Sequence, residues 1–143
     1  MPKFQFRKIV DIERDKIFQI STDYENFTKV LPAYFKELKI IEKKENTTII
    51  QEKIEFLGRT VDVLTEHTVE LPDRHIVRML DGQAKGSVFD ERYEIVGNKT
   101  KITIDIDFVL NGGLKILGLF AKGKIKQSMN MVMDEFVNHA KSK

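Results

Sequence analysis

The sequence contains no cysteine and no tryptophan, and only three prolines and eight glycines among its 143 residues. The lack of cysteine excludes disulfides, thiolate nucleophiles and thiolate metal sites. No apolar run approaches the roughly 20 residues of a membrane-spanning helix. The opening segment MPKFQFRKIV also lacks the long apolar stretch of a signal peptide. We therefore expect a cytoplasmic protein.

A marked excess of charge of one sign is also missing. Lys and Arg number 24 against 22 Asp and Glu, which gives a formal net charge of +2. The basic residues are spread along the chain, so we expect no nucleic-acid partner. The chain has no linker, repeat or low-complexity segment, and residues 1–143 are expected to form one domain.

The longest regular pattern lies at the C-terminus, where apolar residues recur at steps of three and four and predict a helix with one apolar stripe. A helix of about 28 residues is roughly 42 Å long, so it needs a large apolar surface to cover. The stripe consists of Leu114, Leu117, Ala121, Ile125, Met129, Val132, Phe136 and Ala140.

The rest of the chain predicts one antiparallel sheet. An alternating segment over residues 4–12 predicts a first strand, and residues 13–31 predict two short helices, the second beginning after Asp23. Residues 36–110 alternate with period two and are interrupted by five turn signals, which predicts six strands joined as hairpins. Such a sheet has one apolar face, and the C-terminal helix is the element long enough to cover it.

This order of elements resembles the helix-grip fold of the START-related, birch-pollen-allergen-like superfamily (SRPBCC). Three phrases carry the resemblance: DYENFTKVLPAYFKELKII, VELPDRHIVRMLDG and GNKTKITIDIDFVL. They are most similar to the polyketide cyclase/dehydrase and coenzyme-Q-binding branch. The resemblance implies an α+β protein in which a seven-stranded curved antiparallel sheet (β-α-α-β6-α) wraps around the C-terminal helix. It also implies a cavity between sheet and helix, but it names no ligand.

Hairpin registers predict which side chains face the helix. A turn over Gly97–Thr100 places Tyr93 opposite Ile104 and Phe89 opposite Phe108. A turn at Gly58–Arg59 places Ile54 opposite Val63, and a two-residue turn at Pro72–Asp73 places His67 opposite Arg78 and Thr65 opposite Leu80. The inner face is then apolar with four exceptions, which are Glu52, His67, Arg78 and Glu91.

In this arrangement His67, Arg78 and Glu91 form a row across three adjacent strands. Charges on a core face are costly unless they are paired, hydrated or used. The row is either an internal ion pair, a polar handle for an amphipathic ligand, or an acid–base pair of His67 with Glu91. His67 and His75 are expected on opposite faces, so no metal site is predicted. No glycine-rich phosphate loop follows a strand, so no cofactor is predicted either.

The function expected from this reading is the binding of a hydrophobic or amphipathic small molecule, such as a lipid, an isoprenoid quinone or a polycyclic aromatic. Glu91, Arg78, His67 and Tyr93 would orient its polar end. The predicted apolar wall is Phe27, Leu31, Phe56, Val63, Leu80, Phe89, Ile104, Phe108, Leu117, Ala121, Ile125 and Met129. Two alternatives stay open: an enzyme similar to aromatase/cyclases, with no catalytic residue assigned, and a protein- or ribosome-interaction module whose cavity is incidental.

The start of the C-terminal helix is apolar on nearly every side. Ile116, Leu119 and Phe120 lie off the main stripe, with Lys115, Lys122 and Lys124 close by. These apolar residues either pack on neighbouring loops or form a cavity rim that contacts a membrane transiently, with the lysines facing anionic headgroups.

Overall fold

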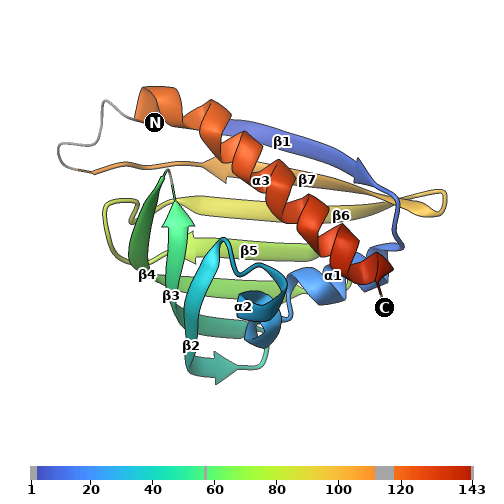
Figure 1. Cartoon of the computed structure of the whole chain (residues 1–143), viewed down its shortest axis with the longest axis horizontal. Helices are drawn as coiled ribbons and strands as arrows, with labels where there is room; N and C mark the ends of the chain where they lie inside the picture. Colours follow the sequence, from blue (N-terminus) through green and yellow to red (C-terminus); the bar gives the residue numbers. More distant parts are fainter. Residues whose placement is uncertain (1–2, 57, 112–117, 143) are drawn as a thin grey trace.

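The computed structural model describes residues 3–56, 58–111 and 118–142, without the side chains of Phe56 and of residues 118–121. Seven strands form one antiparallel sheet in the order β1-β7-β6-β5-β4-β3-β2. The long helix α3 crosses one face of this sheet, and the short helices lie near its C-terminal end (Figure 1). The elements are β1 (Lys3–Val10), α1 (Arg14–Ser21), the 3-10 helix η1 (Tyr24–Asn26), α2 (Phe27–Val30), β2 (Phe35–Lys44), β3 (Thr47–Phe56), β4 (Arg59–Glu70), β5 (Arg74–Met79), β6 (Val88–Val96), β7 (Lys99–Asp107) and α3 (Gly118–Lys141).

The predicted α+β helix-grip fold is confirmed. Successive strand residues point to opposite faces, and the apolar set of β7, which is Ile102, Ile104 and Ile106, is almost fully buried on the side of α3. On the opposite face Arg92 and Asp105 are exposed. The helix therefore lies on the apolar side of the sheet and not on the charged side.

Helix α3 covers the sheet with the predicted stripe. Ile125, Phe136 and Ala140 are buried, and Met129 and Val132 are half-buried against the core. An inward-facing Lys8 of β1 anchors the polar edge of the helix through a 3.0 Å ion pair with Asp134 and a hydrogen bond to Asn130. Leu114 and Leu117 lie outside the described residues.

The two predicted short helices are present, with the second preceded by a 3-10 turn. In α1, Ile17 and Phe18 are buried, as the apolar spacing predicts. Asp23 precedes η1 and accepts a 2.6 Å hydrogen bond from the Asn26 side-chain amide. Phe27 of α2 then packs into the core against Phe136 of α3, with ring centroids 5.5 Å apart.

Two predicted registers are wrong by two residues, which leaves every side chain on its predicted face. The β6–β7 loop contains two residues, so Tyr93 pairs with Ile102 and not with Ile104. In the β3–β4 hairpin, Ile54 likewise pairs with Val61 and not with Val63. An even shift preserves the alternation, because side chains repeat every second residue.

The β4–β5 register is wrong by one residue, and this reverses the faces of β5. Glu70 pairs with Arg74, so the loop has three residues where the sequence reading assumed two. Arg78 therefore lies on the outer face, where its side chain is 45% exposed and lies 3.6 Å from Glu66. His75 takes the inner position, because an odd shift turns every side chain of the strand over.

Candidate functional site

A cavity of about 150 Å³ lies between the inner face of the sheet and α3. Its helix side is apolar apart from Ser128. On the sheet side, the wall is partly apolar and partly polar, and the polar part comes from inward-facing residues of β3, β4, β5 and β6. The apolar lining is Phe27, Phe35, Ile54, Val77, Met79, Phe89, Ile125, Met129, Val132, Met133 and Phe136.

The polar wall is a continuous chain of buried side chains across four adjacent strands. Glu52 Oε2 lies 2.7 Å from the Thr65 hydroxyl, which lies 3.0 Å from His67 Nε2. His67 Nδ1 lies 3.0 Å from His75 Nε2, and His75 Nδ1 lies 2.8 Å from Glu91 Oε1. Each of these residues is at most 8% exposed, so the whole chain is shielded from water.

Strand alternation and register bring this chain together. Thr65 and His67 are alternate residues of β4, and His75 directly faces Glu91 across the β5–β6 pair. The two imidazole rings are stacked, with centroids 5.2 Å apart and planes inclined by 16°. The three-residue loop between β4 and β5 is thus what places His75 beside His67.

The chain continues from Glu91 to the short helix α1. The Tyr93 hydroxyl lies 2.9 Å from Glu91 Oε1 and 2.8 Å from Ser21 Oγ. Burial raises the pKa of Tyr93 well above its usual value, with Glu91 adding to the effect, so this phenol stays protonated and donates. Glu91 Oε1 therefore faces two groups, the His75 ring and the Tyr93 hydroxyl.

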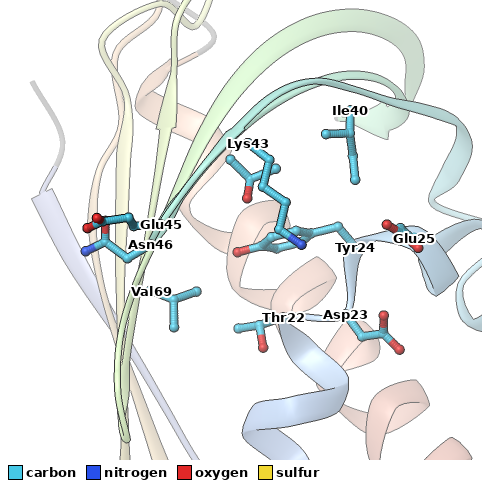
Figure 2. A pocket seen from close by; sticks show the side chains of 10 residues that line it. Thr22, Asp23, Tyr24, Glu25, Ile40, Lys43, Glu45, Asn46 and Val69 are labelled. Carbon is cyan, nitrogen blue, oxygen red and sulfur yellow. The ribbon is translucent and has the colours of Figure 1, made fainter.

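Tyr24 forms the outer cover of the histidine pair. Its ring centroid is 4.5 Å from that of His67 and 5.8 Å from that of His75. On its other side it borders a groove of about 340 Å³ beside the β2–β3 turn, where Figure 2 shows it below Lys43 and opposite Asn46. Burial, and then the charges of Glu91 and Glu52, raise the pKa of Tyr24. Tyr24 therefore separates the buried chain from this groove.

Burial and nearby charges also determine the protonation state of His67. Burial lowers the pKa of His67 from its ordinary value of 6.5, and the nearby Glu52 opposes the shift. Desolvation has the larger effect, so His67 is neutral near pH 7. A neutral imidazole carries one N–H, so one of its ring nitrogens donates and the other accepts.

One oxygen of the polar wall has no partner. Glu52 is 4% exposed, and its Oε1 makes no hydrogen bond to any residue that the structure describes. The Tyr24 hydroxyl is the other buried side-chain atom without a hydrogen bond in the described part of the chain. A buried polar atom left unpaired costs about 1–3 kcal/mol, so Glu52 Oε1 marks a position where a ligand group can bind.

Among the described residues, no group of three or more His, Asp or Glu side chains is arranged to hold a metal ion. The cavity wall includes instead Glu52, a buried carboxyl group whose Oε1 has no hydrogen bond to a described residue, and the row of titratable groups that continues from it. Such a site can bind a hydrogen-bond donor and exchange protons with it.

The structure brings together part of the predicted site. Phe27, Phe89, His67, Glu91, Ile125 and Met129 line the cavity. Leu31, Val63, Tyr93, Ile104 and Phe108 are buried in the surrounding core and do not line it. Arg78 and Leu80 do not face it, because the β5 register was predicted wrongly. Leu117 and Ile116, and the side chains of Phe56, Leu119, Phe120 and Ala121, lie outside what the structure describes.

Sequence reasoning missed five residues of the chain and its cover: Glu52 as a ligand contact, Thr65, His75, Ser21 and Tyr24. A signal for His75 was present, since Arg74 and Arg78 share one parity in β5 and two arginines favour the solvent face. Thr65, Ser21 and Tyr24 carried no such signal, because an isolated hydroxyl group is common on either face of a strand, as at Thr65, and on either side of a short helix, as at Ser21 and Tyr24.

The described helices include none that is long and apolar enough to cross a membrane. No family profile matches the sequence, and no curated protein matches it either. Solved structures do match. The protein TTHA0849 from Thermus thermophilus has a TM-score of 0.84 at 11% identity, covering 99% of this chain and 98% of its own.

Two further matches carry functional names. The ZhuI aromatase/cyclase from Streptomyces sp. R1128 has a TM-score of 0.84 at 9% identity, covering 98% of this chain and 93% of that one. A START superfamily protein from Mycobacterium smegmatis has a TM-score of 0.78 at 13% identity, covering 98% and 97%. At such low identities the likeness is one of fold. The chain has the helix-grip fold of the START-related and birch-pollen-allergen-like proteins.

Proposed function

We propose that this protein binds a small hydrophobic molecule that carries one hydroxyl or N–H group, in the cavity between the sheet and α3. The observation that carries the proposal is the apolar void of about 150 Å³ whose lining includes Glu52, a buried residue with an unpartnered Oε1 among the described residues. The fold supports it, since a START protein and an aromatase/cyclase share it. We also propose that residues 1–143 act as one domain in the cytoplasm.

The size of the void narrows the ligand class. An engineered apolar cavity of about 150 Å³ binds benzene, so this one accommodates a single ring or a short chain. The ring end of a larger aromatic or quinone fits, whereas a complete isoprenoid chain does not fit the described space. Burial drives binding, at about 0.8 kcal/mol for each CH₂ removed from water.

The polar wall restricts the class of ligand further. Glu52 Oε2 is engaged with Thr65, so Oε1 is the free acceptor whether the carboxyl is ionised or carries its proton on Oε2. A ligand group that only accepts leaves Oε1 unpaired, at a cost of about 1–3 kcal/mol. A hydroxyl or N–H donor is therefore favoured over an ether, ester or bare hydrocarbon.

A matched pair of probes tests the proposal. Benzyl alcohol and ethylbenzene have the same number of non-hydrogen atoms and differ in one hydroxyl. We expect benzyl alcohol to bind at least as tightly by calorimetry, although water solvates it better. Ethylbenzene binding at least tenfold more tightly would show that Oε1 receives no hydrogen bond, and failure of both to bind would contradict the cavity as a ligand site.

Variants of Glu52 provide the control. In Glu52→Gln the amide N–H₂ can donate to Thr65 while its oxygen still faces the ligand, so benzyl alcohol binding is retained. Glu52→Met has a similar length but no acceptor, so the preference for benzyl alcohol is lost. Native mass spectrometry of freshly purified protein provides an independent test, because a bound small hydrophobic molecule adds its mass.

The two alternative functions predict different results. An interaction module with an incidental cavity predicts that filling the cavity leaves activity toward the partner unchanged. An aromatase/cyclase-like enzyme predicts chemistry at the polar wall, and the buried titratable chain is the observation that favours this second role.

A further inference from the structure

The hydrogen bonds between Glu52 and Glu91 need more protons than neutral histidines supply. Four contacts join the two carboxyl groups through Thr65, His67 and His75, and each contact needs one proton. The Thr65 hydroxyl and two neutral imidazoles provide three. Four simultaneous hydrogen bonds therefore require one additional proton, and two carboxyl groups that share it carry a net charge of −1.

The geometry indicates where this proton rests. Glu91 Oε1 faces the His75 ring and the Tyr93 hydroxyl, and the same Tyr93 hydroxyl lies within donating distance of Ser21 Oγ. Glu52 Oε2 lies 2.7 Å from the Thr65 hydroxyl and 3.8 Å from His67 Nε2, and its Oε1 has no hydrogen bond to a described residue. A buried anion needs donors, so the contacts favour an arrangement with the negative charge on Glu91 and the proton on Glu52 Oε2. Both histidines are then neutral with the proton on Nδ1, in agreement with the burial of His67.

We propose that this chain is a proton relay, through which a ligand with an acidic hydroxyl, such as a phenol or an enol, transfers its proton to the site. The proposal rests on the proposed function, because the ligand must occupy the cavity. It assigns the cavity an acid–base activity in which Glu52 contacts the ligand and Glu91 is the final proton acceptor.

The transfer balances without a co-reactant. The ligand O–H bond breaks and a new O–H bond forms at Glu52 Oε1. The proton on Glu52 Oε2 passes to Thr65, the Thr65 proton to His67 Nε2, the His67 Nδ1 proton to His75 Nε2, and the His75 Nδ1 proton to Glu91. The ligand keeps the electron pair of its O–H bond and becomes an anion that accepts a hydrogen bond from Glu52.

The net charge of the site stays at −1 throughout, so no new charge is buried; the charge moves from Glu91 to the ligand. The other titratable groups against the chain are Tyr24 from η1 and Tyr93 from β6, both of which stay protonated. The described α3 residues that line the cavity are uncharged. Tyr34 and Glu55 line it as well, and Glu55 accepts a hydrogen bond from the exposed Thr60.

The resting state is tested by ¹⁵N NMR of the histidine rings in the full chain. We expect His67 and His75 to be neutral Nδ1–H tautomers in the wild type and unchanged in Glu52→Gln, since the amide donates to Thr65 as the acid does. Glu91→Met should change the tautomers, because it removes the oxygen that accepts from both His75 and Tyr93. An imidazolium ring, an Nε2–H tautomer in the wild type, or a change in Glu52→Gln would overturn the assignment.

The transfer itself is tested with 4-nitrophenol, whose phenolate absorbs visible light, and with 4-nitrotoluene, which has the same number of non-hydrogen atoms and no acidic proton. Binding of 4-nitrotoluene reports the cavity alone. In the wild type, bound 4-nitrophenol should show phenolate absorbance at a pH where the free probe is mostly neutral. Glu91→Gln should bind both probes and reduce the bound phenolate fraction at least tenfold.

Calorimetry in two buffers of different ionisation enthalpy completes the test. An internal transfer releases no proton, so the binding enthalpy of 4-nitrophenol should be the same in both buffers. A probe that binds and stays neutral in the wild type, or a full proton released to the buffer, would overturn the relay and leave the proposed function intact. Failure of both probes to bind would contradict the proposed function instead.

Discussion

Filling the cavity should abolish ligand binding and raise the stability of the protein, whereas most core substitutions lower stability. Val77 on β5 is half-buried and lines the void of about 150 Å³. Empty volume enclosed in a core costs about 24 cal/mol per Å³, so a void of this size costs at most about 3.6 kcal/mol. In Val77→Phe the added atoms fill about a third of it, which corresponds to a gain of up to about 1.2 kcal/mol.

Thermal unfolding followed by circular dichroism measures the effect. For a chain of this size a gain of about 1.2 kcal/mol raises Tm by about 3–5 °C. Ile95→Phe adds an aromatic ring at a residue that is 60% exposed, so it should change neither Tm nor binding. A Val77→Phe variant that binds benzyl alcohol as tightly as the wild type would refute the reasoning, because the ring and the ligand cannot share the space.

Three further predictions test the polar wall and the register. Tyr93→Phe removes one of two donors to Glu91 in a buried site, and denaturant unfolding should show a loss of about 2 kcal/mol. The lowered pKa of His67 means that the unfolded chain takes up a proton below its ordinary value of 6.5 while the folded chain does not. Stability should therefore fall as the pH drops below about 6.5, by at most about 1.4 kcal/mol per pH unit, and His67→Gln should flatten this slope. Arg78→Ala should lower the free energy of unfolding by less than about 0.5 kcal/mol in the same assay, because the ion pair of Arg78 with Glu66 is exposed. A decrease of several kcal/mol would indicate instead that Arg78 points into the core.

Alternation and helical spacing were sufficient to predict the fold. Ile102, Ile104 and Ile106 of β7 are buried as their period of two predicts, and Ile125 and Phe136 are buried as the helical stripe predicts. These patterns repeat over many residues, so one misplaced turn does not erase them.

The site could be predicted only in part, because it depends on loop lengths one residue at a time. An error of two residues in the β6–β7 hairpin left Glu91 on the correct face. An error of one residue in the β4–β5 loop placed Arg78 on the inner face, where the structure has His75. The predicted row of His67, Arg78 and Glu91 is therefore a pair of histidines next to Glu91. The Tyr93–Ser21 contact joins residues 72 positions apart, and no local pattern specifies it.

The crystal structure of the chain with benzyl alcohol tests the central claim most directly. We predict the ring between Val77 of β5 and Met129 of α3, with the hydroxyl at about 2.7–3.0 Å from Glu52 Oε1. Benzyl alcohol bound elsewhere, or α3 packed onto Val77 with no space for a ring, would contradict the account.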